Sequence, residues 1–465
     1  MKHLSIDGFA GGGGASCGLK MAGIDVTIAI NHDPAAIRMH TVNHPYTIHL
    51  TEDIFQVDLS KYMSPDDVVD VMWASPDCTS HSKAKGGQPR QSGLRILPWA
   101  VFRLCKQIKE ITGHLPQMLF MENVEEIQEW GELDAKGCPI PSKKGEEYNR
   151  FINRMTDLGF SFDCRTLTAA DYGAPTTRKR WYAVFRSDGK KILWPGPTHS
   201  KGGANGLLPW KPVSDVLDFA DLGTSIFERE KPLADATLKR IANGIEKFIV
   251  KNPDPFFLPE QQAMPFLIQY HSETSATDVR GQTVTEPLKT IDTSNRYALI
   301  SVFITKFYKT GTGQEVVEPL HTITTSPGHF GLVSVFLIKY YGTGNGQSVT
   351  DPIATITTKD RFGMVSTIMM KDGEKYAIAD IRLRMLKPEE LKLAQGFPKD
   401  YVIDHDIEGK RYPVKDQVAK IGNSVVPIMA AKIVKANLES TEQEKYENKK
   451  YYKQGMLFRI TRQTA

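Results

Sequence analysis

The sequence is poor in cysteine and has no long hydrophobic run. Its five cysteines are scattered over 465 residues and none forms a CxxC pair, so neither a disulfide framework nor a zinc site is expected. No stretch approaches the ~20 apolar residues that cross a bilayer, and glycines break the short apolar N-terminus, unlike a signal peptide. A net charge of +4 permits a polyanionic partner without requiring one. We therefore expect a cytoplasmic protein that uses neither membrane nor metal.

Strand-like and helix-like segments alternate along residues 1–186. Short apolar runs predict strands, and apolar residues at helical spacing predict helices between them. This alternation predicts an α/β fold, with a doubly wound, mainly parallel sheet covered by helices on both faces. The expected strands are 3–10, 25–31, 68–74, 117–123 and 180–186, and the expected helices are 15–23, 34–43, 99–111 and 146–159.

Residues 187–378 have a different texture, rich in turn-forming residues and containing an internal repeat. Each copy combines β-branched runs with Gly, Pro or Asn, a composition typical of strand–turn–strand units. We therefore expect a second, mostly β domain here. The three copies span 266–302, 303–335 and 336–367.

The chain beyond this region is expected to rejoin the first domain. A helical pattern after Ala377 predicts that residues 379–440 complete the N-terminal domain. The last segment, 441–465, is charged and is predicted to be a peripheral tail.

Two strand ends carry residues suited to chemistry. Cys78 follows the apolar run 68–74, between polar or rigid neighbours that offer no hydrophobic core. In open α/β sheets, ligands bind beyond the carboxyl ends of the strands. The alternative for Cys78 is an inert, buried thiol. The glycine-rich stretch from Asp7 to Leu19 would let a ligand approach the backbone at a helix N-terminus. It matches neither GxGxxG nor a phosphate-binding P-loop.

Six motifs, in order along the chain, resemble those of the DNA cytosine-C5 methyltransferases. They are DGFAGGGG from Asp7, PDCTSHS from Pro76, FMENV around Glu122, YGAPTTRKR ending at Arg180, RMLKPEELKLAQGFP, and GNSVVP from Gly422. The resemblance implies an α/β methyltransferase domain that uses S-adenosylmethionine (SAM), with a target-recognition domain between the last arginine motif and QGFP.

The resemblance also implies catalytic roles. Cys78 would add to C6 of a flipped cytosine, because a covalent adduct activates C5 for methyl transfer. Glu122 would protonate or hydrogen-bond ring N3, and Arg180, with Arg178 beside it, would stabilise charge at O2. The alternative for these charged residues is an ordinary solvated surface.

The cofactor residues are likewise implied by the resemblance. Asn31 stands where the family usually has a glutamate for the ribose hydroxyls, and Asp77, Thr79 and Thr176 also depart from the family pattern. The expected SAM-binding residues are Asp7, Phe9, Ala10, Gly11, Gly12, Gly13, Gly14, Asn31, His32, Asp53, Ile54, Pro76, Asn423, Ser424 and Val425.

The expected partner is duplex DNA, bound by a monomer. Loops of the repeats carry Lys306, Lys309 and Lys339 among glycines and aromatics, which suits phosphate and base-edge contacts, and Ser82 is a further candidate. The alternative is a plain β scaffold with solubilising lysines. We expect an enzyme encoded by a prokaryote or a phage that acts on DNA at the nucleoid. Restriction–modification systems contain enzymes of this kind.

Three other functions share part of this pattern. A tRNA cytosine-C5 methyltransferase would use the same catalytic motifs, but the large middle region argues against it. An amino-group methyltransferase would resemble (D/N/S)PP(Y/F/W), but the corresponding stretch SPDC has Cys78 where the aromatic residue that stacks on the base would stand. A catalytically inactive DNA-binding homologue would not need Cys78, Glu122 and Arg180 together.

Overall fold

The computed structural model describes residues 1–77, 95–270, 280–306, 336–339, 347–348, 362–365, 368–371 and 374–438. The chain forms two compact units. Unit 1 contains Met1–Lys211, Pro287–Ser294 and Leu391–Ala465, and unit 2 contains Pro212–Glu286 and Asn295–Glu390. The boundaries predicted after residues 186 and 378 fall before these unit boundaries and stay predictions. In the described part of the chain, no helix is long and apolar enough to span a membrane.

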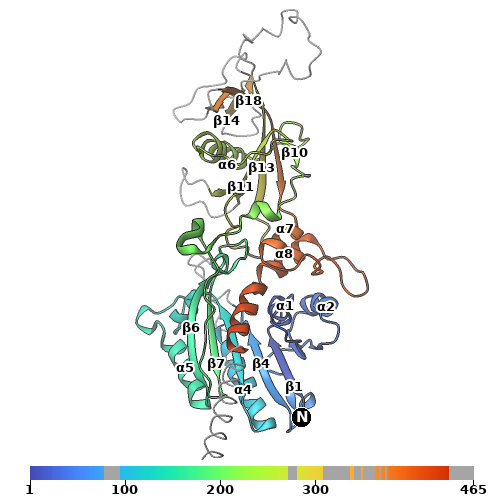
Figure 1. The fold of residues 1–465 in the computed structure, drawn as a ribbon, viewed down its shortest axis with the longest axis vertical. Helices are drawn as coiled ribbons and strands as arrows, with labels where there is room; N and C mark the ends of the chain where they lie inside the picture. Colours follow the sequence, from blue (N-terminus) through green and yellow to red (C-terminus); the bar gives the residue numbers. More distant parts are fainter. Residues whose placement is uncertain are drawn as a thin grey trace, which may run out of the picture. The chain divides into compact units, whose positions relative to one another are not determined.

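Unit 1 is built on a mostly parallel seven-stranded sheet in the order β3-β2-β1-β4-β5-β7-β6 (Figure 1). The strands from β3 to β5 pair in parallel, and β7 runs antiparallel to both of its neighbours. The predicted α/β class is therefore confirmed. The strands are β1 (His3–Gly8), β2 (Ile28–Ile30), β3 (Ile48–Leu50), β4 (Val68–Ala74), β5 (Met118–Asn123), β6 (Ser161–Thr168) and β7 (Lys179–Arg186).

The five predicted strands are present, but β3 and β6 were not expected from the sequence. Both lie at the edges of the sheet. β3 has only three residues, and β6 alternates exposed with partly buried positions. An edge strand needs little apolar surface, so neither segment carries the apolar run that marks a buried parallel strand.

Helices cover both faces of this sheet, as predicted. Alternate residues of β4 enter two different cores: Met72 packs in the core that contains Leu104, and Trp73 packs in the core that contains Met429. Successive side chains of a strand point to opposite faces, so both faces are buried. The helices are α1 (Gly14–Met21), α2 (Pro34–Asn43), α4 (Leu97–Thr112), α5 (Glu146–Leu158), α8 (Val414–Gly422) and a helix at 427–438.

Unit 2 contains an antiparallel sheet in the order β10-β18-β13-β11-β12, with β17 also paired to β18. Its core joins Phe266 and Ile300 of the sheet to Ile241 of helix α6 (Asp235–Ile245). The strands are β10 (Thr224–Ser225), β11 (Ala263–Gln269), β12 (Gly281–Thr283), β13 (Tyr297–Lys306), β17 (Ile368–Lys371) and β18 (Glu374–Met385).

The first sequence repeat forms antiparallel strands. β11 pairs with both β12 and β13, which confirms the strand–turn–strand prediction for the described part of 266–302. The second and third copies lie largely outside the described residues. A separate three-stranded sheet includes β14 (Phe336–Lys339), β15 (Gln347–Ser348) and β16 (Phe362–Val365).

The prediction that helix returns directly after Ala377 is wrong. Strand β18 continues to Met385, and helix α7 begins only at Pro388 and ends at Ala394. Ile381, Leu383 and Met385 alternate with arginines, which is the period of a strand rather than a helix. β18 pairs with β13 along this whole stretch.

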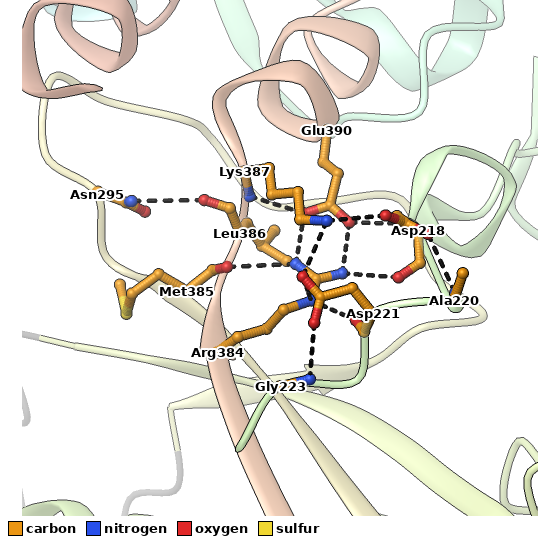
Figure 2. A network of polar contacts seen from close by, with 10 residues as sticks. All are labelled: Asp218, Ala220, Asp221, Gly223, Asn295, Arg384, Met385, Leu386, Lys387 and Glu390. Carbon is orange, nitrogen blue, oxygen red and sulfur yellow. Dashed lines mark hydrogen bonds and ion pairs between the residues drawn. The ribbon is translucent and has the colours of Figure 1, made fainter. Parts of the chain in front are cut away.

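A polar network within unit 2 fixes the turn between β18 and α7 (Figure 2). Arg384 donates to both carboxylate oxygens of Glu390, with N–O distances of 2.6 and 2.8 Å. Glu390 also accepts the backbone N–H groups of Asp218 and Lys387. Both side chains of the ion pair are nearly buried, so these hydrogen bonds compensate the cost of desolvating the two charges.

The remaining elements are short. Strands β8 (His199–Ser200) and β9 (Leu208–Pro209) form a small parallel pair. The helical turns are η1 (Leu59–Lys61), η3 (Glu125–Glu129), η4 (Pro141–Lys143), η5 (Ala169–Tyr172), η6 (Lys201–Gly206), η7 (Val213–Val216) and η8 (Glu246–Val250).

Candidate active site

The segment that leads to Cys78 is fixed beside the end of β5. β4 and β5 are parallel neighbours with Ala74 opposite Met121, so both strands end at the same edge of the sheet. The side-chain amide of Asn123 then donates to the carbonyl of Pro76 at 3.0 Å. Cys78 and Ser82 themselves lie outside the described residues. The structure therefore places Pro76 beside Asn123 at the predicted site. The position of Cys78 stays a prediction.

Glu122 and Arg180 form a buried ion pair at this edge. Arg180 Nε lies 3.3 Å from Glu122 Oε1, and the two side chains are only 13% and 9% exposed. Arg180 also donates from Nη1 to the carbonyl of Lys179 at 2.8 Å. Neither Nε nor Oε1 makes a hydrogen bond of good geometry to any residue that the structure describes. These two buried atoms therefore interact with each other as an ion pair.

Arg178 contacts backbone rather than standing free at the sheet edge. Its Nη1 donates to the carbonyls of Ile291, at 3.1 Å, and Gly422, at 3.0 Å. The side chain is buried, and these bonds join three stretches of unit 1 that are far apart in sequence. They support a structural part for Arg178, and its predicted catalytic role stays a prediction.

The glycine-rich stretch forms a tight turn between β1 and α1. Gly11 and Gly13 adopt positive φ values of 52° and 92°, and Phe9 does so at 68°. The N–H of Ala10 donates to the carbonyl of Ile30 at 3.0 Å, which fixes the turn against β2. Because α1 begins at Gly14, its unpaired N–H groups and positive dipole end lie directly after the turn.

The C-terminal GNSV segment packs against this turn. A Cβ atom on Gly14 would collide with Ser424 Oγ and the carbonyl of Val425. Ser424 and Val425 are buried, whereas Asn423 is exposed. Gln395 fixes the segment by donating to the carbonyl of Ser424 at 3.0 Å. The structure therefore brings together the glycine turn and the two buried residues of GNSV.

The predicted ribose and adenine residues follow β2 and β3. Asn31 accepts the Asp33 N–H through Oδ1 at 2.8 Å, and His32 beside it is exposed. Asp53 is exposed, and its Oδ1 accepts the N–H of Phe55 at 3.0 Å. Ile54, in contrast, is buried in the core that contains Met72, which limits it to a backbone or partial contact.

A buried polar cluster that was not predicted from the sequence lies beneath the glycine turn. Ser16 Oγ donates to Asp7 Oδ2 at 2.6 Å and lies 2.8 Å from His40 Nε2. Burial raises the pKa of Asp7 to about 7, against the hydrogen bonds from Ser16. Tyr401 donates to the carbonyl of Gly12 at 2.7 Å. The spacing of His40, His44 and His49 was the signal that could have revealed the cluster.

A second contact that was not predicted closes the turn from the side of α8. Lys420 forms an ion pair with Asp33, and its Cβ lies against Gly12. Asp33 also caps α2 by accepting the N–H of Ala35 at 2.9 Å. Both oxygens of the Asp33 carboxylate therefore contact groups within unit 1.

The three lysines predicted to contact DNA are not placed by the structure. Lys306 ends strand β13 and Lys339 ends strand β14, but their side chains are outside the described part of the chain. Lys309 lies outside the described residues altogether.

The arrangement suits a bound nucleoside cofactor and a second reactant. The glycine turn, the α1 N-terminus and the GNSV segment pack so closely that a side chain at Gly13 or Gly14 would collide with neighbouring atoms. The carboxylate oxygen Asp7 Oδ1 is buried there without a hydrogen-bond partner among the described residues. The Glu122–Arg180 pair lies at the same, carboxyl edge of the sheet, as do binding sites of open α/β folds generally.

These features define an α/β protein whose candidate site lies at the carboxyl ends of its parallel strands. The chain belongs to the family of C-5 cytosine-specific DNA methylases, whose family model matches residues 4–439. It is 29% identical to the type II methyltransferase M.AgeI of Thalassovita gelatinovora over 44% of either chain. It is 25% identical to M.AquIA of Picosynechococcus over 47% of this chain and 88% of that protein.

The matched region spans about half the length of most type II methyltransferases that the chain resembles. One example is M.DdeI of Desulfomicrobium norvegicum, which is 30% identical over 43% of its own length. Two solved structures align with nearly the whole chain, each with a TM-score of 0.48. They are the Dnmt2 methyltransferase of S. pombe, at 14% identity and coverage of 94% and 99%, and the EhMeth methyltransferase of Entamoeba histolytica, at 12% identity and coverage of 95% and 99%.

Proposed function

We propose that this chain transfers a methyl group from SAM to C5 of a cytosine in a specific duplex DNA sequence. The observation that carries the proposal is the buried Glu122–Arg180 pair, which lies beside the segment that leads to Cys78. An acid, a cation and a thiol at one strand edge are what addition to a cytosine ring requires. The membership of the chain in the C-5 cytosine methylase family supports the same substrate.

The cofactor is held at the glycine turn. Residues from Asp7 to Gly14, with Ser424 and Val425, line the cofactor site, and Asn31 and Asp53 follow the two neighbouring strands. When bound, SAM supplies an electrophilic methyl group. Asn31 offers an amide N–H to the ribose where a glutamate would offer a carboxylate, since its Oδ1 already accepts the Asp33 N–H. His32, Ile54, Pro76 and Asn423 complete the proposed cofactor residues.

The chemistry begins with the Cys78 thiolate. Its sulfur adds to C6 while Glu122 delivers a proton to N3, so that the ring becomes an enamine with carbanion character at C5. Arg180, beside Glu122, stabilises the charge that develops at O2. After C5 is methylated, a base removes the C5 proton, and the electrons of that bond re-form the C5–C6 double bond and expel the thiolate.

The target base must leave the DNA stack to reach this site. Extrusion costs a few kcal/mol, so a separate surface has to grip the duplex. We assign that part to residues 187–378, with Lys306, Lys309 and Lys339 as DNA contacts. Ser82, outside this region, is a further DNA contact, and one protomer acts at each site. The named type II relatives support a place in restriction–modification.

Trapping with a modified substrate tests this function. Fluorine at C5 cannot leave as a proton does, so duplex DNA with 5-fluorocytosine at the target should form a covalent adduct that survives denaturing gels. Cys78→Ser should abolish the adduct while SAM still binds. As a control, Cys138→Ser, at a partly exposed cysteine of the same unit, should trap normally.

Two outcomes would contradict the proposal. An adduct that persists in Cys78→Ser would make another residue the nucleophile. Methylation of tRNA but not of mixed-sequence duplex DNA, followed with labelled SAM, would establish the tRNA alternative instead. Bisulfite mapping of the methylated DNA would give the target sequence.

A further inference from the structure

A continuous chain of hydrogen bonds links Asp7, beneath the glycine turn, to a histidine near the surface. Asp7, Ser16 and His40 are each at most 1% exposed. Ser16 Oγ lies 2.6 Å from Asp7 Oδ2 and 2.8 Å from His40 Nε2. His40 Nδ1 lies 2.8 Å from Nε2 of the half-buried His49, which is also hydrogen-bonded to the backbone of Thr47.

Each link of this chain can hold one proton, so the whole chain has only two consistent arrangements. In the first, His49 Nε2–H donates to His40 Nδ1, His40 Nε2–H donates to Ser16, and Ser16 donates to an ionised Asp7. In the second, every bond is reversed: a protonated Asp7 donates to Ser16, Ser16 to His40 Nε2, and His40 Nδ1–H to His49 Nε2. His49 then carries its proton on Nδ1 and donates it to the Thr47 carbonyl, a bond that the first arrangement lacks. The neutral imidazole has one donor and one acceptor nitrogen, which permits both arrangements.

The two arrangements differ by a single proton. A proton from water binds His49 Nδ1, where the Thr47 carbonyl accepts its hydrogen bond. The Nε2 proton of His49 moves to His40 Nδ1, and the Nε2 proton of His40 moves to Ser16 Oγ. The Ser16 hydroxyl proton then moves to Asp7 Oδ2. Both histidines and the serine end as neutral as they began, and the net change is neutralisation of Asp7.

We propose that His49, His40 and Ser16 form a proton relay that sets the charge of Asp7, and that this charge tunes how strongly the site prefers SAM over its demethylated product. The proposal rests on the proposed function. SAM carries a positive sulfonium, whereas S-adenosylhomocysteine has a neutral thioether. An ionised carboxylate buried beneath the cofactor turn attracts the cation, and burial shields that attraction from salt. Neutral Asp7 makes the two ligands more alike.

The surroundings keep the relay neutral except at Asp7. Burial lowers the pKa of His40 well below its ordinary value, with His44 and His49 adding to the effect. Burial raises the pKa of Asp7 to about 7, so its charge changes near neutral pH. The other titratable or charged groups that face the cluster are His44 and Lys20, Tyr401 and Cys17, and Asp400 beside Cys17.

Calorimetry on the full chain tests the consequence for binding. The SAM and S-adenosylhomocysteine affinities of the wild type should diverge as pH rises from 6 to 8, with SAM favoured by a further roughly threefold to tenfold, the effect of one partly screened charge. Asp7→Asn, which cannot ionise, should show a smaller change in the ratio of the two affinities over this pH range. Comparing the variant with the wild type removes the titration of the ligands themselves, because both proteins bind the same two ligands. His3→Gln, at an exposed histidine paired with Asp70, should behave as wild type.

Nitrogen-15 NMR on the histidine-labelled, ligand-free chain tests the relay itself. The His40 ring should change from the Nε2–H to the Nδ1–H tautomer as pH falls through about 7, without becoming cationic. Ser16→Ala removes the link to Asp7 and should fix His40 in one tautomer over this range. A role in packing alone predicts no such change, so this readout holds even if Asp7→Asn folds poorly.

The outcomes separate the two proposals. A His40 ring that keeps one tautomer in the wild type, or that becomes an imidazolium, overturns the relay. An Asp7→Asn variant that keeps the pH dependence of the wild-type affinity ratio overturns the role of Asp7. Failure of the chain to bind either ligand at any pH would instead remove the proposed cofactor, and the NMR result would still decide the relay.

Discussion

At the scale of single residues, the site depends on close backbone approach and on buried polar groups. Gly14 touches Ser424 and Val425 so closely that a methyl group has no room. Asn123 uses its amide to hold Pro76, and Glu122 keeps an oxygen without a hydrogen bond among the described residues. Each of these features would be lost with one substitution, while the surrounding strand would remain.

Gly14→Ala should weaken SAM binding and destabilise the fold. The new methyl group meets Ser424 Oγ and a backbone carbonyl, and such overpacking costs roughly 1–3 kcal/mol. Gly196→Ala is the matched control, because a Cβ there meets no atom within 4 Å. Urea unfolding and calorimetry with SAM measure both effects. Wild-type SAM affinity in Gly14→Ala would show that GNSV does not shape the cofactor site.

At the scale of elements, two antiparallel strands carry much of the polar organisation. β7 brings Arg180 to Glu122 across β5, and β18 brings Arg384 to Glu390 at the first turn of α7 (Figure 2). Both pairs are nearly buried, so each partner depends on the other. Removing one member of such a pair leaves an uncompensated charge.

Arg384→Met should therefore be strongly destabilising. Glu390 would stay buried without its bidentate partner, at an expected cost of about 3–5 kcal/mol in the free energy of unfolding. Lys251→Met is the control, since its pair with Glu246 has side chains 70% and 58% exposed and should contribute less than about 1 kcal/mol. Chemical denaturation of both variants measures the difference. Equal losses in the two variants would mean that the Figure 2 network adds no more than a surface pair.

At the scale of the whole molecule, we expect chemistry and sequence choice to reside in different parts of the chain. Unit 1 contains the glycine turn, GNSV and the Glu122–Arg180 pair. Unit 2 contains the antiparallel sheet and most of the repeats, and the proposed target-recognition region overlaps it. Variants in the two parts should therefore differ in which step they affect.

Lys309→Ala and Lys339→Ala should each lower DNA affinity and reduce the salt slope by about one, because a phosphate contact releases a counterion. Arg180→Ala should depress single-turnover methylation more than binding, because its charge acts on the developing transition state. Lys106→Ala, at an exposed lysine of α4 paired with Glu110, is the control. DNA affinity at several salt concentrations and single-turnover rates measure the separation.

Two results would contradict that division. Lysine variants with wild-type affinity and salt slope would show that those loops do not grip phosphates. An Arg180→Ala variant that binds DNA poorly but methylates bound DNA at the normal rate would make Arg180 a binding residue.

The sequence by itself determined the features that depend on local patterns. Buried strands of this sheet carry unbroken apolar runs, so β1, β2, β4, β5 and β7 were visible as strands. Glycine turns and the short motifs around Cys78, Glu122 and Gly422 are contiguous, so these motifs alone were enough to indicate the family and the expected site. Local patterns failed where a strand needs few apolar residues, as in β6, and where a period of two was taken for a helix, as in β18.

The tertiary structure decided which of these residues meet. Arg178 contacts Ile291 and Gly422, and Gly14 contacts Ser424, over separations that no sequence window covers. The hydrogen-bonded contacts from His49 to Asp7 exist only because α1, α2 and β3 pack around the end of β1. Hydrogen bonds of this kind depend on distances of about 3 Å that arise when the whole sheet and its helices assemble, and the amino-acid order alone does not contain them.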